Sequence, residues 1–283
     1  MDSHNMDMNM MEMNSCQSWS YQAGDSMKAL IEVTKTDSDD HKKKSRRIEY
    51  KTHNAIYYTM RFLFECGYKL KANPITIATA SVISHRFFKE FDTGYDKYLI
   101  AATSLYIAGK LKDEKYKLRD VINVAHQTLH RGSSPLDFRE EYFMRRDAIV
   151  QAELLIMRTL QFRISTPSTH KYLLHYLSTL KTWLTKEIWE TVPLCQSSFA
   201  FLQDFHHDPL VLEFAPQNIA LGCIHLAMQC YGVDVPCIPE TDDFCWFTVF
   251  YQHAKKDDIW QVIEAIMDIY NREEQSPGNA KNF

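Results

Sequence analysis

The hydrophobic positions of this chain recur mostly with the spacing of amphipathic helices, and proline marks where several of them begin. Asn73-Pro74 has the form of an N-cap followed by proline at the first helical position, and Thr166-Pro167, Val192-Pro193 and Ala215-Pro216 place proline at similar starts. The pattern predicts helices over residues 50–70, 74–91, 96–111, 118–129, 138–162, 167–183, 193–206, 216–231, 243–253 and 257–270. The predicted fold class is therefore all-α.

Two of the predicted helices are apolar on nearly every side, and they are similar to each other. A helix without a polar face must be buried all round, so residues 98–111 are predicted to form a central helix. Residues 99–110 (LIAATSLYIAGK) align with residues 218–229 (NIALGCIHLAMQ) at an offset of 119 residues. Each is the third of five predicted helices, which favours two tandem five-helix folds, each packed around its own central helix.

The pattern divides the chain into four segments. Residues 1–47 are polar and Met-rich, end in the basic run Lys42–Arg47, and are predicted to form a disordered tail. The basic run is compatible with a nuclear localisation signal, a nucleic-acid contact or a solvated charge run. Residues 48–163 are predicted to form the first helical domain, residues 164–271 the second, and residues 272–283 a flexible carboxyl terminus.

The amino-acid composition limits the classes of ligand and cofactor that this chain could bind. With 8 glycines in 283 residues, the chain shows neither a dinucleotide-binding fingerprint nor a P-loop, and we expect no cofactor. A net charge of −4 offers no general attraction for nucleic acid or anionic membranes. The chain has no apolar stretch of membrane-spanning length and no signal-peptide pattern, and its seven cysteines form no C-x-x-C motif. These features favour a nuclear or cytoplasmic protein with reduced thiols. We expect no metal site, because His206-His207-Asp208 is a poor chelate on a helix.

One carboxylate falls on an apolar helix face. When the helix around Ile149–Leu160 is projected at about 100° per residue, Glu153 lies among the apolar positions. A buried carboxylate needs a cationic partner, and Lys110, at the end of the first central helix, is the candidate. Alternatively, Lys110 compensates the dipole of its own helix and Glu153 reaches water from the rim of its face. Gln229 stands at the position of the second half that aligns with Lys110, so the charge is specific to the first half. This difference suggests that the charge serves a function rather than the stability of the fold.

Five motifs in order resemble the cyclin family, in particular its transcriptional-type subgroup. They are Ile77-Ala-Thr-Ala80, His85-Arg-Phe-Phe88, Leu105-Tyr-Ile-Ala-Gly-Lys110, Leu118-Arg-Asp-Val-Ile122 and Glu153-Leu-Leu-Ile-Met-Arg-Thr-Leu-Gln-Phe162. The resemblance covers about residues 50 to 270, and it implies two cyclin folds without catalytic activity of their own. The segment 48–163 would then be the amino-terminal cyclin box.

The resemblance implies a function in kinase regulation. A cyclin forms a heterodimer with a cyclin-dependent kinase and presses on the kinase's αC helix, which brings the activation loop into its active arrangement. The expected kinase-binding surface comprises Lys110, Leu111, Asp113 and Glu153, with Lys110 and Glu153 paired. This chain departs from the common pattern of two acids after the apolar residue, because Lys112 precedes Asp113. The alternative is a DNA-binding general transcription factor of the same fold, which the acidic balance of residues 48–270 disfavours.

Overall fold

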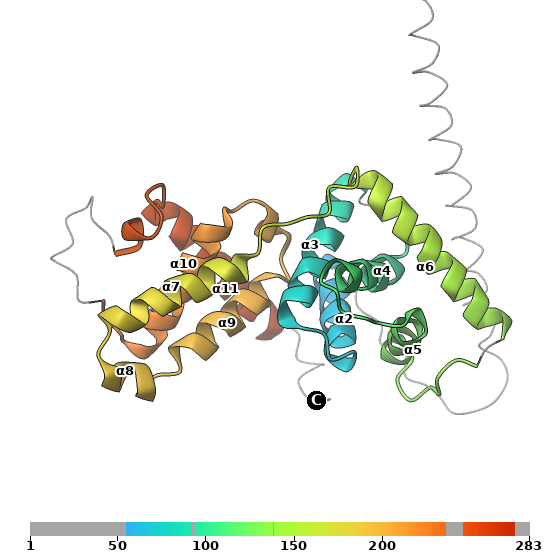
Figure 1. Cartoon of the computed structure of the whole chain (residues 1–283), viewed down its shortest axis with the longest axis horizontal. Helices are drawn as coiled ribbons and strands as arrows, with labels where there is room; N and C mark the ends of the chain where they lie inside the picture. Colours follow the sequence, from blue (N-terminus) through green and yellow to red (C-terminus); the bar gives the residue numbers. More distant parts are fainter. Residues whose placement is uncertain (1–54, 92–93, 138, 236–245, 275–283) are drawn as a thin grey trace, which may run out of the picture. The chain divides into compact units, whose positions relative to one another are not determined.

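The computed structural model describes residues 55–91, 94–137, 139–235 and 246–274, and its regular elements are α-helices and short 3-10 helices (Figure 1). The helices are α2 (Ala55–Lys69), α3 (Pro74–Glu90), α4 (Lys97–Leu111), α5 (Leu118–Leu129), α6 (Glu140–Thr159), α7 (Thr169–Trp183), α8 (Lys186–Thr191), α9 (Leu194–Phe205), η2 (Pro209–Leu212), α10 (Pro216–Tyr231), η3 (Trp246–Val249) and α11 (Lys256–Glu274). The all-α prediction is confirmed. The predicted tail at residues 1–47 lies outside the described residues.

One predicted helix is wrong, and one short helix was not predicted. The described part of residues 243–253 forms only the 3-10 helix η3, while α8 follows α7 without a sequence prediction. The carbonyl of Phe247 accepts hydrogen bonds from the amides of both Phe250 and Tyr251, which closes the chain into a turn. The ring of Phe250 then packs 5.0 Å from that of Trp183. Burial of aromatic rings in the core therefore overrides the helical pattern here.

The chain divides into two compact units. Unit 1 comprises the described residues up to Ala72 together with Phe87–Arg163. Unit 2 comprises Asn73–Arg86 together with the residues from Ile164 onward. Most of α3 therefore belongs to the second unit.

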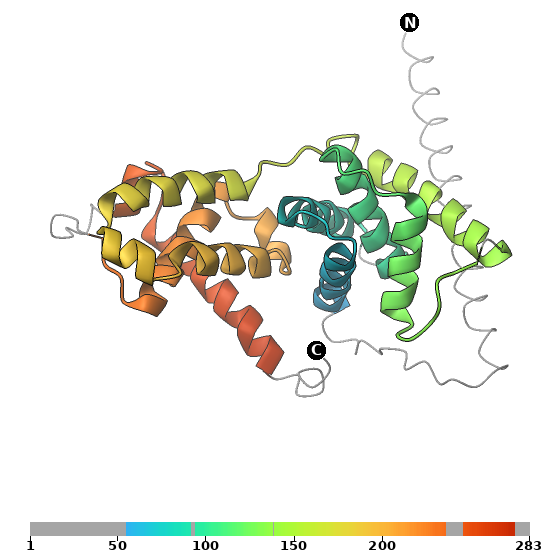
Figure 2. The same cartoon turned by 60° about the horizontal axis from the view of Figure 1, so that its bottom comes forward.

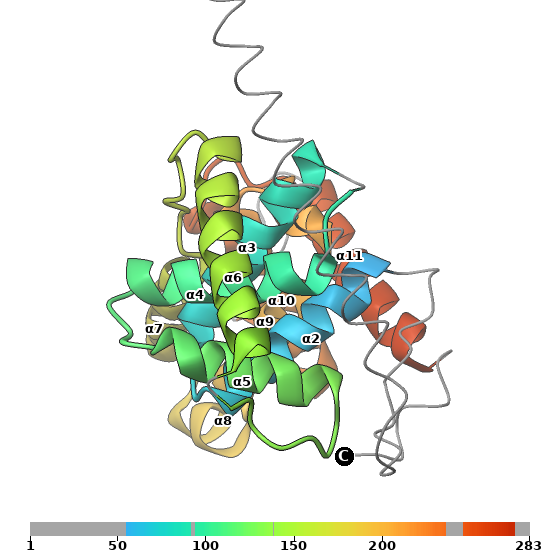
Figure 3. The ribbon, with the colours of Figure 1, turned by 90° about the vertical axis from the view of Figure 1, so that its right-hand side faces the viewer.

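In unit 1, α4 is the central helix and packs against α2, α5 and α6. The carboxylate of Asp96 caps its amino end by accepting hydrogen bonds from the amides of Tyr98 and Leu99. Every residue from Ile100 to Gly109 except Tyr106 is buried, as the uniformly apolar sequence predicts. In Figure 3, α6 runs from top to bottom, and α4 and α5 pack against it.

In unit 2, α10 takes the same central place and packs against α7, α9 and α11. The red helix in Figure 2 is α11, which also contacts α9. The two helices approach closely at Gly222, where an added Cβ would lie 2.7 Å from Cγ1 of Val262. The prediction of two helical repeats, centred on residues 99–110 and 218–229, is confirmed.

Several helices end in the same hydrogen-bonded turn, in which a residue with positive φ reverses the chain. The left-handed position is Lys71 after α2, Asp113 after α4, Gln161 after α6 and Gly232 after α10. Three of these four are not glycine, although only glycine adopts this conformation without steric cost. This chain therefore uses few glycines even at helix ends, where glycine is usually preferred.

No helix within the described ranges is long and apolar enough to cross a membrane.

Candidate partner-binding site

Lys110 owes its position to the way α4 ends. The amide of Glu114 donates to the carbonyl of Gly109, and the amide of Asp113 donates to that of Lys110, so the chain turns back sharply after the helix. An added Cβ at Gly109 would overlap the ring of Tyr116, which lies against the helix at this point. The returning segment thus packs on the small residue and leaves Lys110, in the last turn, free to extend toward α6.

Lys110 and Glu153 form the predicted ion pair. The ammonium nitrogen Nζ lies 2.7 Å from Oε1 and 2.9 Å from Oε2 of the carboxylate, so it donates to both oxygens. The same nitrogen lies 4.2 Å above the ring centroid of Tyr106, one helical turn earlier on α4. Burial by itself would lower the pKa of Lys110, but hydrogen bonding and charge from Glu153, supported by Tyr106, raise it above its ordinary value.

The ion pair lies at the surface rather than in the core. The Lys110 side chain is 50% exposed and the Glu153 side chain 23% exposed. A pair with this much water around it contributes under about 1 kcal/mol to the free energy of unfolding. The sequence correctly indicated the pairing, but the structure shows an exposed ion pair where the sequence predicted a buried one. The small stabilisation of the fold therefore does little to explain why Lys110 and Glu153 are paired.

An exposed apolar stripe follows α6 next to the ion pair. The buried face of α6 packs on α4 and α5 through residues such as Ile149 and Ile156. On the opposite side Phe143, Val150 and Leu154 are 43%, 44% and 51% exposed, and they recur at helical spacing on one face. We call these three residues the α6 stripe. Apolar side chains grouped in this way on a helix are typical of a protein-binding surface.

The other two residues of the expected kinase-binding surface lie just beyond Lys110. Leu111 is half-buried at the last position of α4. Asp113 is exposed and has a φ of 58°, so it is the left-handed residue that ends the helix. Aspartate tolerates this conformation better than most residues, which gives Asp113 a structural role whether or not it touches a partner.

Sequence reasoning missed Tyr106 and the α6 stripe. A signal for Tyr106 was present, because a residue four positions before a lysine lies on the same helix face. The stripe had no such signal, because the apolar pattern by itself places Val150 beside the buried face of its helix. Only the packing of α6 shows that this side chain is 44% exposed.

The predicted absence of a metal site rested on the poor geometry of His206-His207-Asp208. In unit 2 the ring nitrogen Nδ1 of His206 donates to the carbonyl of Leu202, and the carboxylate of Asp208 caps η2 by accepting from the amide of Leu210. These side chains thus serve the local backbone. Across the described ranges, no three His, Cys, Asp or Glu side chains gather as ligands would.

Comparison with known proteins matches this chain to cyclins. A family model described as the cyclin amino-terminal domain matches residues 25–165. Cyclin-L1 of Danio rerio is 29% identical over 213 residues, which cover 73% of this chain and 40% of that protein. Cyclin-T1-3 of Oryza sativa is 26% identical over 221 residues, which cover 76% of this chain and 43% of that protein. The chain thus spans about two fifths of the length of the curated relatives it matches.

Two solved structures share the fold. A chain in the crystal structure of the yeast RNA polymerase II CTD kinase CTDK-1 complex aligns with a TM-score of 0.61 and 14% identity, over 77% of this chain and 65% of that chain. A chain in the CAK complex from Chaetomium thermophilum aligns with a TM-score of 0.53 and 19% identity, over 80% of this chain and 65% of that chain. The match to the cyclin amino-terminal domain model and the likeness to cyclins L and T place the chain in the cyclin family, in its transcriptional-type subgroup.

Proposed function

We propose that the chain is a regulatory, non-catalytic cyclin subunit that binds and activates a cyclin-dependent serine/threonine kinase. The observation that supports this most directly is the ion pair Lys110–Glu153 beside the exposed α6 stripe. The pair adds little stability, and the stripe exposes apolar area, so both are best explained by a partner. Lys110, Leu111, Asp113 and Glu153 would lie on the kinase-binding surface together with the stripe.

In this proposal the cyclin acts by positioning rather than by chemistry. The α6 stripe would bury its apolar side chains against the αC helix of the kinase, and the ion pair would hold the end of α4 at the edge of the contact. A kinase is active only when the αC glutamate pairs with the catalytic lysine and the activation loop is ordered. An interface of about 2,000 Å² would be needed to keep that arrangement populated.

The comparisons support the class of partner. The CTDK-1 structure is described as a kinase complex, and the CAK complex was solved with ATP-gamma-S bound. We further propose a finer assignment, on the motifs Pro74-Ile-Thr-Ile-Ala-Thr-Ala80, Arg119-Asp-Val-Ile-Asn-Val124, Ile149-Val-Gln-Ala-Glu-Leu-Leu155 and His170-Lys-Tyr-Leu-Leu-His-Tyr-Leu177. These are similar to cyclin Q, also called cyclin M, and by that resemblance the partner would be cyclin-dependent kinase ten.

The test is co-purification of the full chain with a panel of cyclin-dependent kinases that includes kinase ten, followed by a kinase activity assay. Leu154→Glu places a charge in the centre of the stripe and should weaken binding by about thirtyfold or more. Leu174→Glu is the matched control, because Leu174 is a leucine on α7 that is 61% exposed, and this variant should bind normally. Glu153→Ala should lower kinase activation by about tenfold with little loss of stability.

Two results would refute the proposal. The first is a failure of every kinase in the panel to co-purify with a chain whose circular dichroism shows that it is folded. The second is equal kinase affinity of Leu154→Glu and Leu174→Glu. Binding to cyclin-dependent kinases other than kinase ten would refute only the finer assignment.

A further inference from the structure

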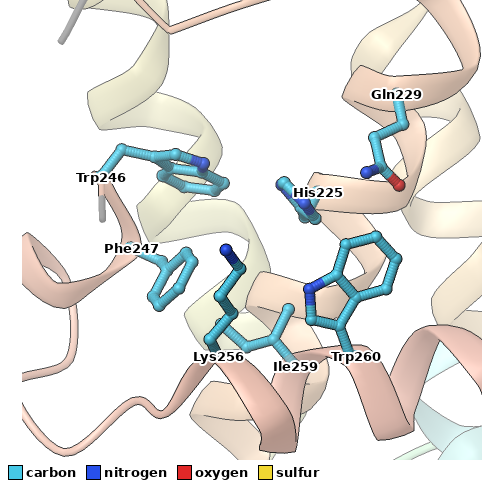
Figure 4. A pocket seen from close by; sticks show the side chains of 7 residues that line it. All are labelled: His225, Gln229, Trp246, Phe247, Lys256, Ile259 and Trp260. Carbon is cyan, nitrogen blue, oxygen red and sulfur yellow. The ribbon is translucent and has the colours of Figure 1, made fainter. Parts of the chain in front are cut away.

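Unit 2 contains a cavity that the proposed kinase-binding surface does not use. It has a volume of about 220 Å³ and lies between the second half of α10, η3 and the first turn of α11. Figure 4 shows its lining side chains, among them His225 and Gln229 from α10, Trp246 and Phe247 from η3, and Lys256 and Trp260 from α11. All of these elements belong to unit 2, so the cavity is complete within that unit.

The walls of the cavity are aromatic. The ring of His225 stands between two indoles, with its centroid 6.1 Å from that of Trp246 and 5.9 Å from that of Trp260. Trp246 is buried, whereas Trp260 is 37% exposed. A large aromatic side chain left this exposed beside a cavity provides a flat apolar surface on which another ring can stack.

A single cation points into this aromatic space. In Figure 4 the ammonium group of Lys256 extends toward the space enclosed by Trp246, Phe247 and His225. No ion pair joins Lys256 to any acidic side chain in the described part of the chain. Lys256 is an exposed residue, so its charge stays in contact with water and is available to an anion that binds beside the rings.

The cavity occupies the place in the second repeat where the first repeat has its ion pair. At the offset of 119 residues that aligns the two central helices, His225 corresponds to Tyr106 and Gln229 to Lys110. In unit 1 Tyr106 packs beneath the ammonium group of Lys110, which Glu153 neutralises. In unit 2 the uncharged Gln229 stands at the position of Lys110, and the lining residues leave an open space next to Lys256.

The shape and charge of the site indicate the class of ligand. A second cavity of about 560 Å³ shares His225, Gln229 and Trp246 and continues along the end of α10 as far as Asp234. The combined depression is longer than one side chain, which suits an extended peptide. The neighbouring carboxylates of Asp234 and Asp257 would repel a polyanion such as a nucleic acid, so one negative charge at Lys256 is favoured.

We propose that this cavity binds a short acidic segment of a partner protein, with an aromatic side chain against Trp260 and an adjacent carboxylate on Lys256. The cavity shares no residue with the α6 stripe, so this proposal and the proposed function rest on different observations. It gives the second repeat a binding role at the position where the first repeat has its ion pair.

The test follows the indole N–H signals of the full chain by nuclear magnetic resonance during titration with end-blocked peptides. The probe is Gly-Phe-Glu-Gly, and two matched peptides, Gly-Phe-Gln-Gly and Gly-Ala-Glu-Gly, lack either the charge or the ring. We expect the probe to shift the signals of Trp246 and Trp260 saturably at millimolar concentrations. Each matched peptide should bind about fivefold more weakly or worse.

Variants separate the charge from the ring. Lys256→Gln should abolish the preference for glutamate over glutamine in the peptide while the need for the phenyl ring remains. Lys255→Gln is the matched control, because Lys255 is an exposed neighbouring lysine that does not line the cavity, and it should change neither preference.

Three outcomes would overturn the proposal. The first is the absence of saturable shifts of the Trp246 and Trp260 signals with the probe. The second is equal affinity for the glutamate and glutamine peptides in the unaltered chain. The third is tighter binding of a single-stranded oligouridine that depends on Lys256, which would make the cavity a nucleic-acid site.

Discussion

Unit 2 contains a cluster of buried histidines whose protonation should control its stability. The ring nitrogen Nε2 of His85 donates to the carbonyl of His206 across 3.0 Å, and the ring of His170 lies 5.7 Å from that of His206. Both His85 and His206 are fully enclosed. Because Nε2 of His85 carries its proton, a second proton would have to bind Nδ1, which finds no hydrogen-bond partner among the described residues.

Burial lowers the pKa of both imidazoles far below the ordinary value. The pKa of His85 falls to about 4 by desolvation, although its hydrogen bond to His206 and the charge of Asp208 act in the opposite direction. The pKa of His206 falls to about 3, by desolvation and by the nearby His170, against its hydrogen bond to Leu202. In the unfolded chain each imidazole titrates near the ordinary histidine pKa of 6.5.

The sign of the effect follows from proton linkage. Below pH 6.5 the unfolded chain binds a proton on each imidazole and the folded chain does not, so acid favours unfolding. Between about pH 7.5 and about pH 5.5, each histidine should remove about 1.3 kcal/mol from the free energy of unfolding, or about 2.7 kcal/mol for the pair. This is a large share of the stability of a typical domain. The loss should continue until the pH reaches the folded values near 4 and 3.

The assay is urea unfolding followed by tryptophan fluorescence at a series of pH values. All the tryptophans among the described residues lie in unit 2, and Trp19, outside those residues, is replaced by phenylalanine in every chain compared, so that the signal reports on unit 2. His85→Gln should halve the loss between about pH 7.5 and about pH 5.5, because one proton-linked group is gone. His175→Gln, which replaces an exposed histidine on α7, should leave the loss unchanged. A loss below about 0.5 kcal/mol in the unaltered chain, or equal losses in all three chains, would refute the reasoning.

Three further predictions concern backbone positions, and all are measured by urea unfolding followed by circular dichroism. Lys71→Gly should stabilise the chain by about 0.5 kcal/mol, because an exposed residue at φ 57° gives up its steric cost; a loss of stability would contradict this. Gly222→Ala should cost about 1–3 kcal/mol, since its Cβ would meet Val262, and Val262→Ala in the same chain should recover part of that cost. Gly109→Ala should cost a similar amount unless Tyr116→Ala is added; an additive double variant would show that the two residues do not interact.

The pairing of Lys110 with Glu153 shows how far sequence reasoning reached toward the site. A carboxylate on an apolar helix face calls for a cation, and the end of a central helix is where a cation can stand, so the partners could be named without coordinates. The solvent exposure of the two side chains could not be predicted from the sequence, because it depends on how completely residues far apart in the chain cover them. The 50% exposure of Lys110 turns a predicted buried pair into a surface pair.

The aromatic segment around η3 shows the same limit in the fold. A helix over residues 243–253 satisfies the local pattern, but the ring of Phe250 packs against Tyr176 and Trp183, which lie some seventy residues earlier in the chain. Contacts of this kind compete with local helix formation and are invisible to a window of ten residues.

By itself the sequence determined the helical class, the two repeats and the two central helices. These depend on the period of apolar residues and on proline and capping positions, which act within a few turns. Only the tertiary structure decided which apolar side chains stay in contact with water. The α6 stripe and the cavity beside Lys256 both belong to helices whose other face is packed, and what a helix leaves uncovered depends on the neighbours that pack against it.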